Sequence, residues 1–178
     1  MKFKINDINV LHSRISPFLK VENDYRIRIL NDKLSSNDFN TILSMIGEKS
    51  FTMLLLYNLG LRKHVNQKKY QLNRYFNITN WKEHVIDNEE VSFPIRFIEV
   101  NQVTDEEIIK YYTGFMRHQV SPLMTNFLTK ETLLRVSPFY LDIVSEDVKL
   151  IGQLKAQFDL LYEKEFDDAE PLSEEDLK

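Results

Sequence analysis

Glycine is scarce in this chain, and that scarcity is the strongest constraint that the sequence places on its fold. Only 4 glycines and 5 prolines occur among 178 residues. A β-sandwich or β-barrel needs many tight turns, and glycine supplies the backbone conformations that such turns require. The composition therefore predicts a mainly helical protein. Hydrophobic residues make up 43% of the chain and aromatic residues 12%, enough for a folded core.

Several features that would mark a secreted or membrane protein are missing. The chain has no cysteine, which excludes disulfides, thiolate metal sites and a cysteine nucleophile. The first twenty residues contain no apolar run of signal-peptide length. The most apolar stretch, residues 51–61, is too short to span a bilayer. These features predict a soluble cytoplasmic protein that makes no membrane contact.

Acidic residues are concentrated near the end of the sequence. Residues 163–178 hold eight acidic residues and two lysines, a local charge of −6. Because the whole chain carries −4, the other residues carry +2. The pattern predicts one globular domain over residues 1–166, followed by a flexible acidic tail over residues 167–178 that is disordered.

Helices are predicted wherever apolar residues recur three and four positions apart. Three segments have this spacing behind a capping or acidic start: residues 35–47, 104–119 and 145–161. A stretch that is apolar on all sides predicts a central helix over residues 50–61. A further helical segment is expected at residues 123–134, after Pro122.

Strands are predicted in two regions. Residues 25–30 alternate between polar and apolar side chains, and residues 81–86 and 91–100 flank a short acidic turn. Pro94 cannot donate a backbone hydrogen bond, so its strand is expected at a sheet edge. The predicted fold is therefore α+β: a mainly helical single domain with a small antiparallel sheet, built from the N-terminal strands and the hairpin near residues 81–100.

Three Ser-Pro pairs begin at Ser16, Ser121 and Ser137, each preceded by a β-branched residue and followed by apolar residues. Serine is a good N-cap and proline suits the first helical position, so each pair predicts the start of a helix or helical turn. An arginine lies two residues before Ser16 and before Ser137, which makes phosphorylation the alternative. The apolar neighbours favour the capping role.

No catalytic motif stands out. The four histidines have no metal-ligand spacing between them, and the densest cluster, His84 with Asp87, Glu89 and Glu90, is more typical of a solvated turn. His118 continues the apolar stripe of its helix, which favours a partly buried structural histidine over a catalytic base. Glycine-rich phosphate loops are absent from the sequence. The sequence predicts no catalytic residue, metal or cofactor, and a small enzyme without a recognisable motif is the least favoured alternative.

The segment over residues 61–81 is the most informative for function. It combines five basic residues with amide and aromatic side chains, as surfaces that bind nucleic acids do. The candidate binding residues are Arg62, Lys63, Asn66, Lys68, Lys69, Asn73 and Arg74. A simpler interpretation is a solvated basic helix whose Tyr70, Tyr75 and Phe76 dock on the core.

These observations favour a non-enzymatic cytoplasmic interaction or regulatory protein that acts through protein–protein contacts. The first alternative is a winged-helix-like protein that binds nucleic acid through residues 61–81. The expected partner is another protein, with nucleic acid and a second copy of the chain as the other choices.

Overall fold

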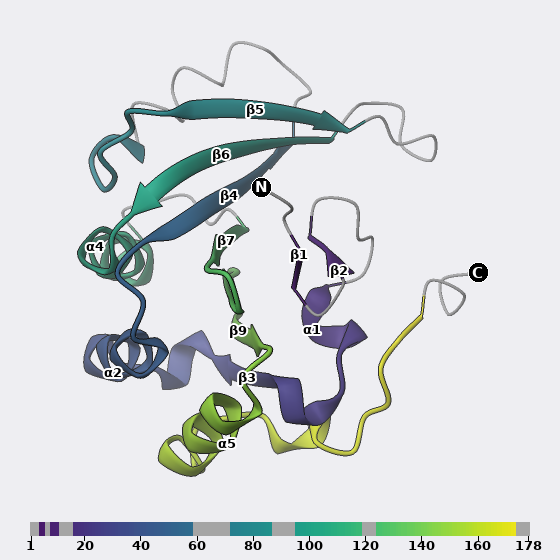
Figure 1. Ribbon diagram of the computed structural model, residues 1–178. Helices are drawn as coiled ribbons and strands as arrows, with labels where there is room; N and C mark the ends of the chain where they lie inside the picture. The colour runs from purple at the N-terminus through teal and green to yellow at the C-terminus, as the bar shows by residue number, and fades with distance from the viewer. Residues whose placement is uncertain are drawn as a thin grey trace.

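A seven-stranded antiparallel sheet is the centre of the fold (Figure 1). The computed structural model describes residues 4–5, 8–10, 16–58, 72–86, 95–118 and 124–173. The strands are β1 (Lys4–Ile5), β2 (Ile8–Asn9), β3 (Arg26–Leu30), β4 (Phe51–Asn58), β5 (Trp81–Ile86), β6 (Ile95–Val103), β7 (Thr125–Leu128), β8 (Thr132–Val136) and β9 (Tyr140–Ser145). The α-helices are α1 (Pro17–Lys20), α2 (Ser36–Ile46), α4 (Asp105–Met116) and α5 (Val148–Gln157), with 3-10 turns at Asn23–Tyr25, Asn31–Lys33 and Lys164–Phe166.

The prediction of a mainly helical domain with a small sheet is wrong. The main sheet has the order β3-β9-β8-β7-β4-β6-β5, and β1 and β2 form a separate two-stranded sheet. Residues 51–58, predicted as a central helix, form strand β4, which lies between β7 and β6. Both faces of β4 are covered, so its sequence is mainly apolar without regular alternation, and periodicity cannot distinguish such a strand from a buried helix.

The prediction of a helix over residues 123–134 is also wrong, because strands β7 and β8 occupy most of this range. The turns in this region were not recognised in the sequence, since hydroxyl side chains close them in place of glycine. Strands β7 and β8 are joined by a turn in which the Thr129 hydroxyl accepts hydrogen bonds from the backbone N–H groups of Glu131 and Thr132, at 3.2 and 2.9 Å. Ser137 closes the turn between β8 and β9, where its hydroxyl accepts from Tyr140 N and donates to Tyr140 O, both at 3.0 Å. Ser137-Pro138 therefore leads into a strand instead of a helix.

Three predicted helices and two predicted strands are confirmed. Helices α2 and α4 begin with reciprocal capping boxes, Ser35 with Asp38 and Thr104 with Glu107. Gly47 ends α2 at φ 71°, a left-handed conformation that suits glycine. Helix α5 begins after Asp147, and strands β3 and β5 lie where alternation placed them. Helix α1 also begins at Pro17, as its Ser-Pro pair predicted.

Pro94 does not mark an edge strand. Strand β6 begins after it, at Ile95, and lies between β4 and β5. Pro94 itself is outside the described residues, as are the Asp87–Glu90 turn and the Ser121-Pro122 pair. Because the strand starts after the proline, its backbone ladder with both neighbours needs no hydrogen bond from that residue.

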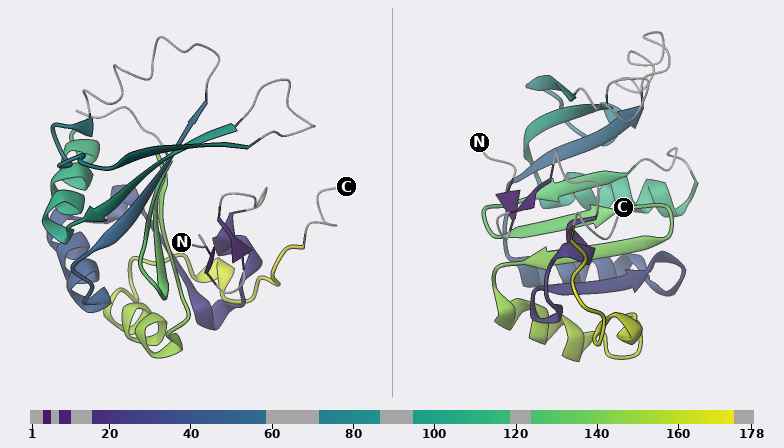
Figure 2. Two further views of the ribbon diagram at one scale, coloured as in Figure 1. Left: turned by 45° about the horizontal axis from the view of Figure 1, so that its top comes forward. Right: turned by 90° about the vertical axis from the view of Figure 1, so that its right-hand side faces the viewer.

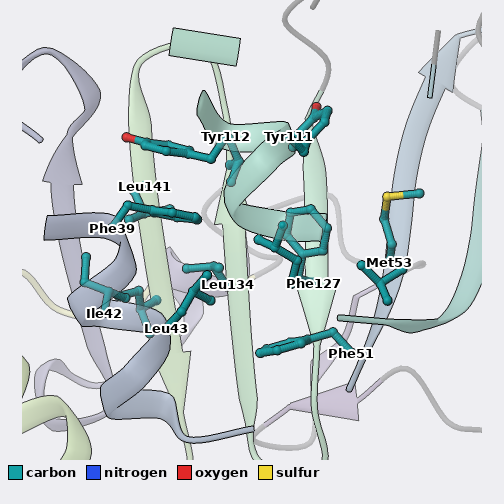
Figure 3. Close-up of a cluster of buried hydrophobic side chains, with 14 of the residues drawn as sticks. Phe39, Ile42, Leu43, Phe51, Met53, Tyr111, Tyr112, Phe127, Leu134 and Leu141 are labelled. Carbon is teal, nitrogen blue, oxygen red and sulfur yellow. The ribbon is translucent and has the colours of Figure 1, made fainter. Parts of the chain in front are cut away.

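Helices α2, α4 and α5 cover one face of the sheet (Figures 1 and 2). Their apolar stripes meet alternate residues of the central strands. Phe39 of α2 stacks on Tyr112 of α4, with ring centroids 3.8 Å apart, and Phe127 of β7 packs beside Tyr111 (Figure 3). All four of these rings are at most 1% exposed, so this layer is the main core.

The opposite face is covered by the two ends of the chain. The β1–β2 hairpin and α1 lie on this side (Figure 1), where Ile5, Val10 and Phe18 pack in one apolar cluster with sheet residues such as Leu54 and Leu133. Phe166 joins the same cluster, with its ring edge-on to Phe18 at 5.3 Å.

The described part of the acidic tail is ordered, contrary to the prediction of a disordered segment from residue 167. Asp167 accepts hydrogen bonds from Lys155 and Tyr162, both at 2.8 Å, and the Leu172 N–H donates to Leu19 O at 2.7 Å. Residues 174–178 are outside the described residues. The tail was expected to be disordered because its composition is polar, but these specific contacts offset the ordering entropy.

A buried ion pair lies under this end of the chain. Arg28 of β3 donates two hydrogen bonds to Asp142 of β9, at 2.6 and 2.8 Å, and the two side chains are 10% and 5% exposed. The Arg28 guanidinium also lies 4.1 Å from the Phe18 ring centroid, 4.3 Å from Tyr140 and 4.8 Å from Phe166. One cation therefore joins the sheet, α1 and the C-terminal segment.

Candidate functional site

A groove of about 510 Å³ lies between α4 and the segment that precedes β5. Its lining consists of residues 73–78 together with Glu106, Glu107 and Lys110 of α4. Two of the predicted binding residues, Asn73 and Arg74, line the groove, and both are exposed. The other five, Arg62, Lys63, Asn66, Lys68 and Lys69, are outside the described residues.

Aromatic docking holds the inner wall of the groove against α4. Leu72 and Phe76 are each 2% exposed, and the Phe76 ring packs 5.2 Å from Tyr111. Tyr75 packs edge-on to Tyr111 at 5.9 Å and lies over Gly114, where a Cβ atom would come within 2.6 Å of the ring. Tyr75 and Phe76 thus dock on the core, as the simpler interpretation of the segment held, and this docking leaves Arg74 directed to the surface.

The Glu107 side chain holds residues 73–78 against α4 by binding the backbone of that segment. One carboxylate oxygen closes the capping box of α4, and the other accepts a hydrogen bond from Asn77 N at 2.5 Å. Glu106 and Lys110 are exposed on the same helix. Residues 105–107 were predicted only as a helix start, because nothing in the sequence indicates which loop lies against that helix.

A second polar cluster lies at the β5 edge of the sheet. The Glu99 carboxylate is 4% exposed, and it accepts from Asn101 Nδ2 at 2.6 Å and contacts His84 Nε2 at 2.6 Å. Burial opposes ionisation of Glu99, but the hydrogen bonds from His84 and Asn101 and the charge of Lys82 outweigh it, so the pKa of Glu99 lies below its ordinary value. These neighbours account for the buried carboxylate without a ligand.

Of the predicted turn cluster, the structure describes only His84, which contacts Glu99. Asp87, Glu89 and Glu90 lie outside the described residues, and within the described ranges no three His, Asp or Glu side chains gather at metal-binding distances. The hairpin was predicted, but its register was not, and the register decides which carboxylate meets His84.

His118 is not the partly buried residue that its apolar stripe predicted. Helix α4 ends at Met116, and His118 follows it as an exposed residue with φ 56°. It is not among the residues that line the groove. The predicted apolar stripe runs about one turn past the end of α4, because no residue pattern indicates where this helix ends.

The described architecture belongs to the class of helix-covered antiparallel sheets, and such a fold by itself sets no activity. No family model, curated protein or solved structure matches the chain. Every helix in the described ranges is too short or too polar to cross a lipid bilayer.

Proposed function

We propose that the protein is a cytoplasmic, non-enzymatic interaction protein that binds a protein partner at the groove beside α4. The observation that carries this proposal is the mixed charge of one concave surface: Arg74 and Lys110 line it together with Glu106. A polypeptide can present both signs of charge and apolar atoms to such a surface. The proposal also includes the other binding residues predicted from the sequence, Arg62, Lys63, Asn66, Lys68 and Lys69, which precede the groove segment in the chain.

A nucleic acid is the second candidate. The exposed cations Arg74 and Lys110 favour it, because affinity for a phosphate backbone comes mainly from lysine and arginine. The winged-helix arrangement is not part of this candidate, since residues 51–58 form a central strand where that fold needs a helix. Carboxylates at the groove disfavour it: Glu106 and Glu107 would face the phosphates of any polynucleotide placed there.

The experiment compares charge reversals at the groove with matched reversals elsewhere. The groove variant is Arg74→Glu/Lys110→Glu, and the control is Lys130→Glu/Lys149→Glu, which changes the net charge equally at exposed positions away from the groove. Partners captured by the wild-type chain are identified by quantitative mass spectrometry, and the affinity for the purified partner is then measured by calorimetry.

A protein partner whose affinity falls at least tenfold with the groove variant, and less than twofold with the control, supports the proposal. Equal losses for both variants would instead indicate a non-specific charge effect and contradict it. Fluorescence anisotropy with random-sequence duplex and single-stranded DNA at low salt tests the second candidate. Steeply salt-dependent binding that only the groove variant loses would place nucleic acid first.

A further inference from the structure

The hydroxyl of Ser16 does not cap helix α1, although its sequence predicted that role. Ser16 occupies the N-cap position before Pro17, but its side chain accepts no hydrogen bond from the helix backbone. Its Oγ instead accepts a hydrogen bond from Arg135 Nη1 of strand β8 at 2.9 Å. Arg135 lies 119 positions away in the sequence. Since the Ser16 hydroxyl has no capping role, the alternative prediction for this residue, phosphorylation, is favoured instead.

Positive charge is in excess around this contact, as counted over the described residues. Among them, Arg26, Arg28 and Arg135 point to the same face of the sheet as Asp142, which pairs with Arg28. The other carboxylate whose charge acts on Arg26, Asp167, pairs with Lys155, so two positive charges on this face have no carboxylate of their own. Arg26 donates to the backbone carbonyls of Phe18, Phe166 and Ala169. These carbonyls are neutral acceptors, and the charge of Asp167 is offset by its pairing with Lys155.

Arg135 lacks a carboxylate of its own in the described part of the chain. Its guanidinium contacts the Ser16 hydroxyl and the Met124 sulfur, and Asp142, which lies opposite it on β9, is held by Arg28. Burial lowers the pKa of the Arg135 guanidinium, with the charge of Arg28 acting in the same direction and that of Asp142 opposing it. A partly buried cation in this setting favours a nearby anion.

We propose that Ser16 is a phosphorylation site and that Arg135 binds the phosphate. A phosphoserine carries about −1.5 to −2 charges at neutral pH, which matches the excess of positive charge. The donor is a nucleoside triphosphate used by a serine kinase. The bond from the terminal phosphorus to its bridging oxygen breaks as the bond to Ser16 Oγ forms, the diphosphate leaves, and the hydroxyl proton passes to the kinase's base. Arg14, two residues earlier, supplies a basic determinant for the kinase.

The chain contains a matched control site. Ser137 has the same local sequence, an arginine two residues before and a proline directly after. Its hydroxyl, however, both donates to and accepts from the backbone of Tyr140 and thereby closes the β8–β9 turn. A phosphate on Ser137 would break these two hydrogen bonds, so the two sites should respond in opposite directions.

The experiment incorporates phosphoserine genetically at position 16 or 137 of the full chain and measures the melting temperature. Phosphoserine at position 16 is expected to raise it by about 2–4 °C, and Arg135→Gln should abolish that rise. Phosphoserine at position 137 should lower it. An unchanged or lower melting temperature for phosphoserine at position 16, or the same rise with Arg135→Gln, would overturn the proposal.

Two further measurements keep the test decisive if Arg135→Gln does not fold. By ³¹P NMR, the second pKa of the phosphate at position 16 should lie below its ordinary value of about 6, since Arg135 favours the dianion, and a value of 6 or above refutes the contact. A serine kinase chosen because it labels a peptide of residues 11–20 should label the folded chain at Ser16 and not at Ser137. Failure to label the folded chain would refute Ser16 as a kinase site.

Discussion

The buried pair between Arg28 and Asp142 provides the sharpest test of how the second face of the sheet is stabilised. Asp142→Ala leaves Arg28 without its carboxylate, enclosed by three aromatic rings and about 10% exposed. An uncompensated buried charge costs about 3–5 kcal/mol. For a protein of this size, that loss corresponds to a fall in melting temperature of about 6–20 °C.

Asp159→Ala is the matched control, because Asp159 pairs with Lys164 at 2.7 Å while both side chains are more than half exposed. Exposed pairs contribute less than about 1 kcal/mol. The double variant Arg28→Met/Asp142→Leu removes both charges and fills the space with apolar atoms, so it should recover most of the stability that Asp142→Ala loses.

Urea unfolding, followed by far-ultraviolet circular dichroism and by the fluorescence of Trp81, measures the free energy of unfolding of each variant. The reasoning is refuted if Asp142→Ala loses no more stability than Asp159→Ala. It is also refuted if the double variant is as unstable as Asp142→Ala, because the loss would then come from packing and not from an unpaired charge.

Three other predictions follow from single contacts. Gly114→Ala should lower the free energy of unfolding by about 1–2 kcal/mol, because the new methyl group meets the Tyr75 ring. In the Tyr75→Ala background the same change should raise the free energy of unfolding by up to about 1 kcal/mol, which is the gain in helix propensity. An equal effect of Gly114→Ala in both backgrounds would contradict the contact. Thr129→Val should cost about 1–2 kcal/mol in urea unfolding, because two turn N–H groups lose their acceptor; a loss below 0.5 kcal/mol would count against the turn. The Glu99 pKa lies below its ordinary value of 4.5, so ionised Glu99 stabilises the folded state above pH 4.5, and this contribution is lost as the pH falls through the folded-state pKa. The difference in free energy of unfolding between wild type and Glu99→Gln should therefore shrink from pH 7 to pH 3. A constant difference would refute the assignment.

The sequence was sufficient for the elements whose signals are local. Helices α2 and α4 combine an apolar stripe with a capping box, and both signals lie within a few adjacent residues. Strand β4 was missed because it is covered on both faces, which removes the alternation that identifies a strand. The turns after β7 and β8 were missed because Thr129 and Ser137 do with hydroxyl groups what glycine usually does by backbone freedom.

The candidate sites likewise contain residues that the sequence indicates locally and residues that only tertiary contacts bring together. Arg74 was found from its basic neighbours, but Lys110 joins it only through the docking of Tyr75 on Gly114, which is a tertiary contact. The contact between Ser16 and Arg135 joins two strongly separated segments. Such pairings depend on strand order, and single-sequence patterns carry no information about strand order when the strands are far apart.

The place of β3 in the sheet has a consequence for how the chain folds. Among the described strands, β3 pairs along its length with β9, whose first residue, Tyr140, lies opposite Leu30, and its one further bridge, from Ile29, is to Tyr162. During synthesis the ribosome must therefore add more than a hundred further residues before the partner of β3 exists. Until then the strand's backbone groups have no ladder to join, and the closure of such a long loop slows folding. A nascent chain of this protein should therefore depend on delayed collapse or on a chaperone to protect β3 from pairing with other chains.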